Sequence, residues 1–508
     1  MLRKLSILII ILSLAGALSH NVGGALPSLS WFFEYGEAVG YTVMGIGFLF
    51  GALLLLSGRK DIEWTPMTLR KFQRFKSIRR GHVSLLILMA LVLFAMLDQA
   101  VVGKRALVVH YNGGWYFPAF TQGQYQDVDF GGSEQSEANY RQLQQTWKAA
   151  GSENWLLMPL VPWAPVLDSQ ELLKVELEQR EDGKYYLQDE DEPYSGNAYT
   201  YYQENESRRH MMYRFRQGIQ KGSSEGFAVN GDRCVKEEWS DGERTRREFF
   251  GEMDAATFDA ASVTPISVVL YPPLAPSFKD RHYLGTDTRG WDIAATIFGG
   301  FQVVLKAALL YLGASYAIGL SIGCLMGYFG GKFDIITQRF IEILANIPFL
   351  YVVMIINNRL DPDQRTISVI VGVMCIFSWI GMTYYMRTAT YREKSRDYVA
   401  ASKLLGASTP RMIFSHIIPN SISTIVTLIP FSFAAVTTAL TALDFIGFGL
   451  PEQYPSWGRT LSNGVENLDA PWIVMSVFAC MVTVLLLVTF VGEAIREAFD
   501  PKKFTYYK

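Results

Sequence analysis

Cysteine is scarce in this sequence, and three of the four cysteines lie in apolar segments. These three are Cys324, Cys375 and Cys480, whereas Cys234 lies in a polar region. A single cysteine cannot form a disulfide within its own region. We therefore expect the cysteines to pack as small apolar residues and not to form bridges.

A nucleotide-binding loop is also missing. A phosphate loop needs Gly-x-x-x-x-Gly-Lys followed by Ser or Thr. The nearest candidate, Gly330-Gly331-Lys332-Phe333, has Met326 and Phe333 at two of the required positions. The six histidines are scattered, and the sequence has no paired-histidine metal motif. The sequence therefore indicates a chain that is not an enzyme and that binds no metal or cofactor of its own.

Excess charge of either sign is absent as well. Basic and acidic residues number 46 and 48, so the chain offers no general attraction for nucleic acid. Half of the residues are hydrophobic, and they come in blocks close to the roughly 20 residues that cross a membrane. These blocks predict an all-α polytopic membrane protein. The candidate spans are Tyr41–Leu56, Val83–Val102, Val303–Tyr328, Ile367–Met386, Asn420–Leu443 and Trp472–Val491, with a weaker one at Ile335–Ile356.

Three of the charged residues inside the candidate spans are of interest for function. Because charge is unfavourable in lipid, Lys306, Arg339 and Glu342 are candidate functional residues. Arg339 and Glu342 are three residues apart, which is equally the spacing of a structural ion pair on one helix. We expect the weaker span, which contains this pair, to face protein or water and not lipid.

Basic residues between the spans Tyr41–Leu56 and Val83–Val102 set the orientation. The loop 59–82 is rich in Arg and Lys, which predicts a cytoplasmic location and attraction to anionic membrane lipid. At the N-terminus, Met1–Lys4 and the apolar Leu5–Leu18 fit either a retained anchor, which we favour, or a cleaved signal peptide. Alternate crossings then divide the chain into a pair of apolar segments (1–58), the basic loop (59–82), a first core span (83–102), an extracytoplasmic domain (103–292), a membrane domain (293–495) with a cytoplasmic loop at 387–419, and a cytoplasmic tail (496–508).

The predicted extracytoplasmic region reads as mainly β-structure. Residues 107–118 alternate like two strands joined by a glycine-containing turn. Residues 168–261 are polar and acidic, with Asp189–Glu192 as a solvated loop. Glycines near positions 196, 218 and 242 end aromatic-rich strands at spacings of 22 and 24 residues. Two interpretations stay open, short hairpin repeats similar to MORN motifs or an ordinary antiparallel sheet, and we favour the sheet.

The loop 387–419, hereafter the coupling loop, has the most informative pattern. Tyr398, Ala401 and Leu405 share one face of a predicted helix, which Gly406 ends. Thr409 is predicted to cap a second helix, with Pro410 at its first position. A short helix joined stiffly to the next span could carry motion from a soluble partner into the membrane. An amphipathic helix at the bilayer surface is the alternative.

The coupling loop resembles the coupling-helix motif of importer permeases, which is Glu-Ala-Ala, three residues, Gly, and later Ile-x-Leu-Pro. Gly406 and Pro419 stand in place, whereas Ala400-Ala401-Ser402 replaces Glu-Ala-Ala and Ile418 replaces the leucine. Asp397, one helical turn earlier, could supply the lost acidic contact. The resemblance assigns contact with an ATPase to Asp397, Tyr398, Ala400, Ala401, Ser402, Leu405, Gly406, Ala407, Ser408 and Pro419.

Segments on both sides of the coupling loop resemble the dipeptide and oligopeptide permease family. Residues 284–292, which alone would be a helix-capping turn, carry Trp291 where the family usually has arginine. Residues 445–458 form a glycine-rich turn in which Trp457 could anchor at the membrane interface. Residues 492–501 resemble the family's exit helix, and 107–118 resemble its microcin C branch. The signature residues are Gly285, Thr286, Asp287, Gly290, Asp292, Gly447, Gly449, Pro455, Trp457 and Gly458.

This resemblance implies a permease helix bundle with an inserted, mainly-β extracytoplasmic domain in a bacterial inner membrane. The implied solutes are peptides or peptide-like molecules. The implied partners are two ATPase subunits that bind ATP and magnesium, a second permease subunit and an extracytoplasmic solute-binding protein. A membrane-anchored sensor or scaffold is the alternative, and it would need neither an ATPase nor Gly406. An ion-coupled transporter lacks support, because no inverted repeat of broken helices is found.

Overall fold

The computed structural model describes residues 2–27, 29–33, 37–57, 66–132, 136–168, 173–187, 191–203, 205–229, 232–250, 255–270, 273–360 and 364–499. The predicted basic loop is thus described from residue 66 and the predicted tail up to residue 499, while residues 189 and 190 of the predicted acidic loop lie outside these ranges. The chain divides into two compact units. We call Met1–Asp168 with Ala275–Lys508 the membrane unit, and Ser169–Leu274 the β unit.

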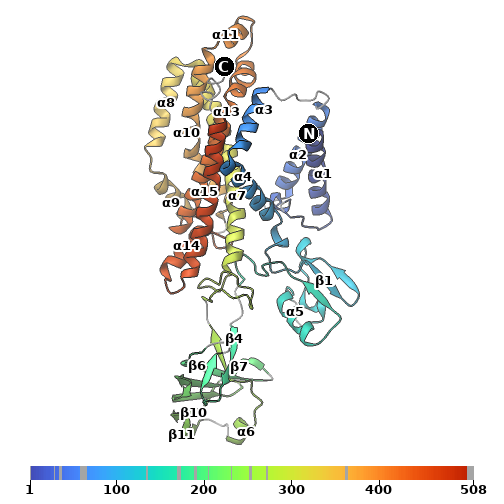
Figure 1. The fold of residues 1–508 in the computed structure, drawn as a ribbon, viewed down its shortest axis with the longest axis vertical. Coiled ribbons are helices and arrows are strands. Elements are labelled where there is room, and N and C mark those ends of the chain that lie inside the picture. Colours follow the sequence, from blue (N-terminus) through green and yellow to red (C-terminus); the bar gives the residue numbers. More distant parts are fainter. Residues whose placement is uncertain are drawn as a thin grey trace. The chain divides into compact units, whose positions relative to one another are not determined.

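Long apolar helices dominate the membrane unit (Figure 1). Among the described residues, five helices are long and apolar enough to cross a membrane, or six if one bent pair counts as a span. Two further apolar helices, α1 and α2, pack on each other near the N-terminus. The helices of this unit are α1 (Leu2–Asn21), α2 (Glu37–Ser57), α3 (Pro66–Ser77), α4 (Arg79–Met96), α5 (Tyr140–Ala149), α7 (Ile293–Phe329), α8 (Gly331–Ala345), α9 (Phe349–Arg359), α10 (Ile367–Lys394), α11 (Asp397–Leu404), α12 (Thr409–Met412), α13 (Ile418–Phe445), α14 (Trp457–Glu466) and α15 (Pro471–Phe499).

A glycine stripe brings α7 and α10 into close contact. Gly319, Gly323 and Gly327 recur every four residues along α7. A Cβ atom added to Gly323 would lie 2.6 Å from the carbonyl oxygen of Thr383 on α10, and one added to Gly327 would lie 2.8 Å from that of Arg387. Small residues at this spacing let two membrane helices approach backbone to backbone. The stripe therefore fixes the pair around which α4, α13 and α15 contribute to one apolar core.

The weak span predicted at Ile335–Ile356 is wrong as a single helix. Two helices, α8 and α9, replace it and meet at a bend of 69°. Pro348 stands at the break, where its missing N–H and its ring oppose a continuous helix. Asn346 ends α8 with its side-chain amide donating to the carbonyl oxygen of Glu342 at 2.7 Å.

A small α/β subdomain follows α4 within the membrane unit. Strands β1 (Val108–Tyr111), β2 (Gly114–Tyr116) and β3 (Trp155–Leu157) form an antiparallel sheet in the order β2-β1-β3. Asn112 and Gly113 join β1 to β2 with positive φ angles of 48° and 81°, as a tight two-residue hairpin requires. Helix α5 covers the sheet through an aromatic core that includes Phe130 and Trp147.

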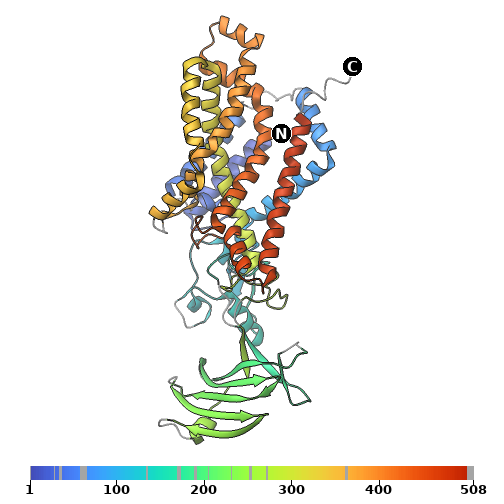
Figure 2. The same ribbon diagram turned by 90° about the vertical axis from the view of Figure 1, so that its left-hand side faces the viewer.

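The β unit is an antiparallel sheet (Figure 2). Its nine strands follow the order β11-β10-β9-β7-β6-β12-β4-β5, with β8 paired to β7. Gly218 and Gly242 have positive φ angles of 76° and 89°, and each lies in a turn between paired strands. The strands are β4 (Leu173–Gln179), β5 (Tyr185–Leu187), β6 (Gly196–Tyr202), β7 (Asn205–Arg216), β8 (Ile219–Gln220), β9 (Gly222–Phe227), β10 (Arg233–Ser240), β11 (Glu243–Phe249) and β12 (Ser267–Leu270), with the short helix α6 (Ala255–Asp259) before β12.

The first and last strands of the β unit are neighbours. Strand β4 pairs with β12, and Leu173 lies directly opposite Leu270. Two apolar clusters, one around Phe215 and Val268 and the other around Met211 and Phe258, are built from residues of this unit alone. The β unit therefore has its own core, and its two ends lie side by side.

Candidate coupling loop and signature turns

The coupling loop folds as two short helices between α10 and α13. Helix α11 follows α10 after a two-residue break, and α12 leads through a π turn, Ile413–Ile417, into α13 (Figure 1). The second helix begins one residue earlier than predicted, since Ser408 is its N-cap and Thr409 its first residue. Pro410 therefore takes the second helical position, where its missing N–H still breaks no helical hydrogen bond.

Gly406 ends α11 in a left-handed conformation. Its φ angle is +82°, its N–H donates to the carbonyl oxygen of Lys403 at 3.0 Å, and the N–H of Ala407 donates to that of Ser402 at 3.1 Å. These two bonds form a Schellman motif, which satisfies the last carbonyls of a helix. No other atom lies within 4 Å of the position that a Cβ atom would take. Gly406 is therefore required by backbone conformation and not by crowding.

One face of α11 is apolar and uncovered in this chain. The side chains of Leu404 and Leu405 are each 88% exposed, and Tyr398 is 40% exposed. Asp397, Ala400 and Ala401 are exposed as well, whereas Val399 is buried against the bundle. The residues predicted to share a face, Tyr398, Ala401 and Leu405, all lie on this exposed surface. Such a surface on an otherwise anchored helix is typical of a docking site for another chain.

Polar contacts hold α11 to its two neighbours. The Tyr398 hydroxyl donates to Glu393 Oε2 on α10 at 2.8 Å, and Ser402 Oγ lies 3.1 Å from His416 Nε2 in the π turn. Burial, followed by this carboxylate, raises the pKa of Tyr398 to about 12, so the phenol stays a donor at neutral pH. The exposed face is therefore presented by a helix that is fixed at both ends.

The base of the coupling loop is tied to α7 and α8. Arg387 on α10 donates to both carboxylate oxygens of Asp334 on α8, at 2.5 and 2.6 Å, and Tyr391 donates to the same carboxylate at 2.8 Å. Lys394 donates to the carbonyl oxygen of Tyr328 near the end of α7. A displacement of α11 would therefore reach three membrane helices through polar contacts at this base.

The first signature turn, residues 285–292, caps the opposite end of α7. Asp292 accepts a hydrogen bond from the N–H of Ala295 at 2.7 Å and lies 2.8 Å from His282 Nδ1. Asp287 closes the turn by accepting from the N–H groups of Arg289 and Trp291. Gly285 and Gly290 have positive φ angles of 77° and 80°. At the position where the family usually has arginine, buried Trp291 lies under the Arg289 guanidinium, 3.7 Å from its carbon.

The second signature turn, residues 445–458, closes around a buried carboxylate. Asp444 at the end of α13 accepts from the N–H of Leu450 at 2.7 Å and from Ser456 Oγ at 2.5 Å. A Cβ atom on Gly449 would lie 1.7 Å from Asp444 Oδ1, and one on Gly458 would lie 2.1 Å from the carbonyl oxygen of Thr441. Both glycines are therefore required by close packing, while Gly447 has a positive φ of 79°. Sequence reasoning missed Asp444, because a lone acid at a helix end carries no distinctive pattern.

Trp457 is buried within the bundle, and its place at a membrane interface stays a prediction. Its side chain is 2% exposed, its N–H donates to the carbonyl oxygen of Ile297 at 2.9 Å, and its ring stacks on Phe301 of α7. Pro455 packs beside it against Gly299 of α7. The indole therefore joins the second signature turn to the start of α7.

Residues that follow the second signature turn contact the first signature turn. Asn463 of α14 donates to Thr288 Oγ1 at 2.6 Å, and Trp472 of α15 donates to the carbonyl oxygen of buried Thr286 at 3.2 Å. Helix α7 runs for 37 residues from this cluster to the base of the coupling loop, which is about 55 Å at the helical rise. The predicted site residues thus form two groups at opposite ends of one bundle.

Comparisons with known proteins match this arrangement. The family of binding-protein-dependent transport system inner membrane components matches residues 319–505, which include the coupling loop. The inner membrane ABC transporter permease protein YejE of Escherichia coli is 28% identical over 441 residues, 86% of this chain and 98% of that protein. The oligopeptide transport system permease protein OppC of Lactococcus lactis is 34% identical over 240 residues, 46% of this chain and 79% of that protein. The chain belongs to this permease family. The peptidoglycan transport system permease protein YejE of Agrobacterium fabrum is 39% identical over 222 residues, 44% of this chain and 58% of that protein.

The three charges predicted inside the spans of this permease have nearby partners. The Lys306 ammonium lies 4.6 Å from the centre of the Trp31 ring, and Trp31 donates to Asp98 Oδ2 at 3.3 Å. Arg339 donates to Glu342 Oε2 at 2.6 Å along one exposed side of α8. Arg339 and Glu342 thus make the structural ion pair that their spacing allows.

Proposed function

We propose that this permease forms part of the pathway for peptides or peptide-like solutes in an ATP-driven importer and that the coupling loop transmits the ATPase cycle to it. The names of the relatives support this class of solute, since they include transport systems for oligopeptides, dipeptides and peptidoglycan. Membership of the permease family supports ATP hydrolysis on separate chains. ATP and magnesium would then bind to two partner ATPases, and a second permease and an extracytoplasmic binding protein would complete the assembly.

The proposed orientation places the coupling loop and the end of α15 in the cytoplasm. Basic α3 packs on the end of α15, where Phe75 contacts Ala494 and Ala498. Gly492 of α15 lies against Phe431 of α13, and the second signature turn and α14 lead from the end of α13 to the start of α15. The start of α13, with its coupling loop, is therefore at the same end as α3. Because basic segments stay inside, the signature turns and both β-rich regions would lie outside.

The exposed face of α11 is the observation that carries the proposed coupling. Leu404 and Leu405 are almost fully exposed beside a rigid helix end, so a partner groove can bury them without refolding the loop. Closure of the ATPase pair would move α11, and Arg387 and Lys394 would carry this movement to α8 and α7. Since the first signature turn caps α7 and Trp457 at the end of the second turn contacts it, the outer end of the pathway would respond.

The first prediction concerns docking of the ATPase. Leu404→Asp with Leu405→Asp should abolish copurification of the ATPase from detergent-solubilised membranes, because two carboxylates cannot be buried in an apolar groove without a large penalty. The permease itself should keep its expression and thermal stability, since both side chains are exposed. The measurement is the amount of ATPase recovered per permease.

A matched control is available at the other end of the bundle. Leu468 is 73% exposed between α14 and α15, and Leu468→Asp should leave ATPase recovery unchanged. Equal ATPase recovery with the double variant and with wild type would refute α11 as the docking site. Failure of well-folded wild type to bring down any ATPase would instead favour a sensor or scaffold.

A further inference from the structure

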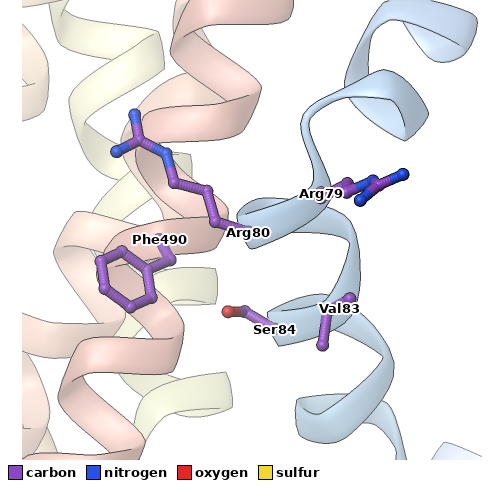
Figure 3. Close-up of a pocket in the computed structure, with 5 residues that line it drawn as sticks. All are labelled: Arg79, Arg80, Val83, Ser84 and Phe490. Carbon is purple, nitrogen blue, oxygen red and sulfur yellow. The ribbon is translucent and has the colours of Figure 1, made fainter.

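A groove opens between the start of α4 and the last third of α15. Its volume is about 340 Å³, and its lining residues are Arg79, Arg80, Val83, Ser84 and Phe490 (Figure 3). The two helices touch beside it, since a Cβ atom on Gly81 would lie 2.0 Å from Ala494 Cβ. The groove is therefore a gap next to a tight helix contact, at the membrane end that also carries α3.

The groove is positive at its mouth and apolar along its wall. The Arg80 side chain extends toward α15, whereas Arg79 extends to the other side of α4 (Figure 3). The side chains of Val83 and Phe490 are more than one-third exposed. They lie about one helical turn further from this end of the bundle than the two arginines do. A molecule with an anionic head and a hydrocarbon chain matches this order of charged and apolar groups.

Ser84 supplies a polar group to the groove. Its side chain is 4% exposed, and it is one of the residues that line the groove. Figure 3 shows its hydroxyl pointing toward α15. This hydroxyl can therefore donate a hydrogen bond to a molecule in the groove.

Neighbouring charges leave the mouth strongly basic. Glu493 of α15 lies 3.5 Å from Arg80, with both side chains about half exposed, and Glu497 lies one turn further on. Against these two acids stand Arg79, Arg80 and the basic residues of α3, which are Arg70, Lys71, Arg74 and Lys76. Ile78 provides no side-chain cap for α4, so N–H groups of its first turn remain available to an anion.

We propose that this groove binds one anionic phospholipid. Its phosphate would sit beside the Arg80 guanidinium at the start of α4, with Arg79 adding positive charge on the other side of the helix, and a glycerol ester oxygen would accept from Ser84. The first part of an acyl chain would lie on Val83 and Phe490. A zwitterionic lipid fits less well, because its ammonium group would enter the same positive mouth. The site is independent of ATPase docking, so each proposal can fail without the other.

The test uses full-length permease with phosphatidylglycerol and phosphatidylcholine as probes. Native mass spectrometry measures how much of each lipid stays bound after titration in detergent. Wild type should retain phosphatidylglycerol in preference to phosphatidylcholine. Arg79→Gln with Arg80→Gln should weaken retention at least about tenfold, since a juxtamembrane arginine contributes on the order of a fivefold effect. Ser84→Phe keeps both arginines but fills the groove and should weaken retention to a similar degree.

Two controls separate lipid binding in this groove from general electrostatic attraction to basic residues. Arg70→Gln with Lys71→Gln removes the same charge from α3, outside the groove, and should change retention less than threefold. Glu493→Gln frees Arg80 from its ion pair and should keep or strengthen retention. Equal binding of the two lipids by wild type would overturn the proposal, and so would an equal loss in the α3 variant or full retention by a folded Ser84→Phe variant.

Discussion

At the scale of single residues, the glycines of this permease serve two distinct needs. Gly406 provides a left-handed backbone with open space around it, whereas Gly323 provides room for another helix. The two needs predict different responses to the same substitution. A methyl group at Gly406 strains only the backbone, while one at Gly323 meets backbone atoms of α10.

Substitution of Gly406 tests the geometry of the coupling loop. Gly406→Ala should weaken ATPase copurification only a few-fold, because alanine in the left-handed region is unfavourable by about 1 kcal/mol. Gly406→Pro should abolish it, since proline cannot adopt the φ of +82° and removes the N–H that Lys403 accepts. Gly331→Ala is the control, because Gly331 also has a positive φ and open space but lies outside the coupling loop. Normal ATPase recovery with Gly406→Pro would show that the turn is dispensable.

Sequence reasoning at this scale succeeded where a residue has one characteristic use. Glycine after an amphipathic segment predicts a helix end, and Gly406 ends α11. The burial of Trp457 could not be predicted, because it depends on Phe301 and Ile297, which are distant from it in the sequence. Asp444 left no sequence signal, since a lone acid at a helix end carries no distinctive pattern, and the place of Ser84 in the groove depends on Phe490, which is distant in the chain.

At the scale of elements, the α7–α10 pair sets the stability of the bundle. Gly323→Ala should lower the free energy of unfolding by about 1–3 kcal/mol, because the added methyl group overpacks a backbone contact. Gly313→Ala on the same helix meets no atom within 4 Å and should be neutral or slightly stabilising, as alanine favours helix. Thermal unfolding of the solubilised permease measures both variants. Equal melting temperatures would contradict a close α7–α10 contact.

The elements also show how far hydropathy could predict this fold. Apolar blocks predicted the helices that became α7, α10, α13 and α15, because length and composition suffice for a straight span. The break between α8 and α9 was missed because apolar residues continue through it, although Pro348 was visible. The glycine stripe was missed for a related reason. Its spacing predicts close packing only once the partner helix is known.

At the scale of the whole molecule, the β unit is separable from the rest of the chain. Replacement of Ser169–Leu274 by a Gly/Ser linker of about eight residues should leave membrane insertion and ATPase copurification intact. Leu173 and Leu270 are directly paired, so their Cα atoms lie about 5 Å apart. Only a few residues of chain separate this pair from the two points to be joined. Membrane fractionation and pull-down measure the outcome. Loss of insertion or of ATPase would mean that the membrane unit depends on the β unit.

The broad organisation of the molecule was readable from the sequence, whereas its contacts were not. The change from apolar blocks to polar, glycine-punctuated strands marked the β-rich insertion near residue 168. The contact between the first signature turn and α14, made by Thr288 and Asn463, which are 175 residues apart, could not be inferred, because it depends on how α7, α13 and α15 pack.

The pairing of β4 with β12 also bears on the history of the chain. A segment whose ends emerge together can enter or leave a gene in one event without disturbing the fold around it. Relatives that differ from this permease by the whole β unit, with little change in the helices on either side, are then the expected intermediates. Selection could thereby change the β unit while the bundle and its coupling loop stay as they are.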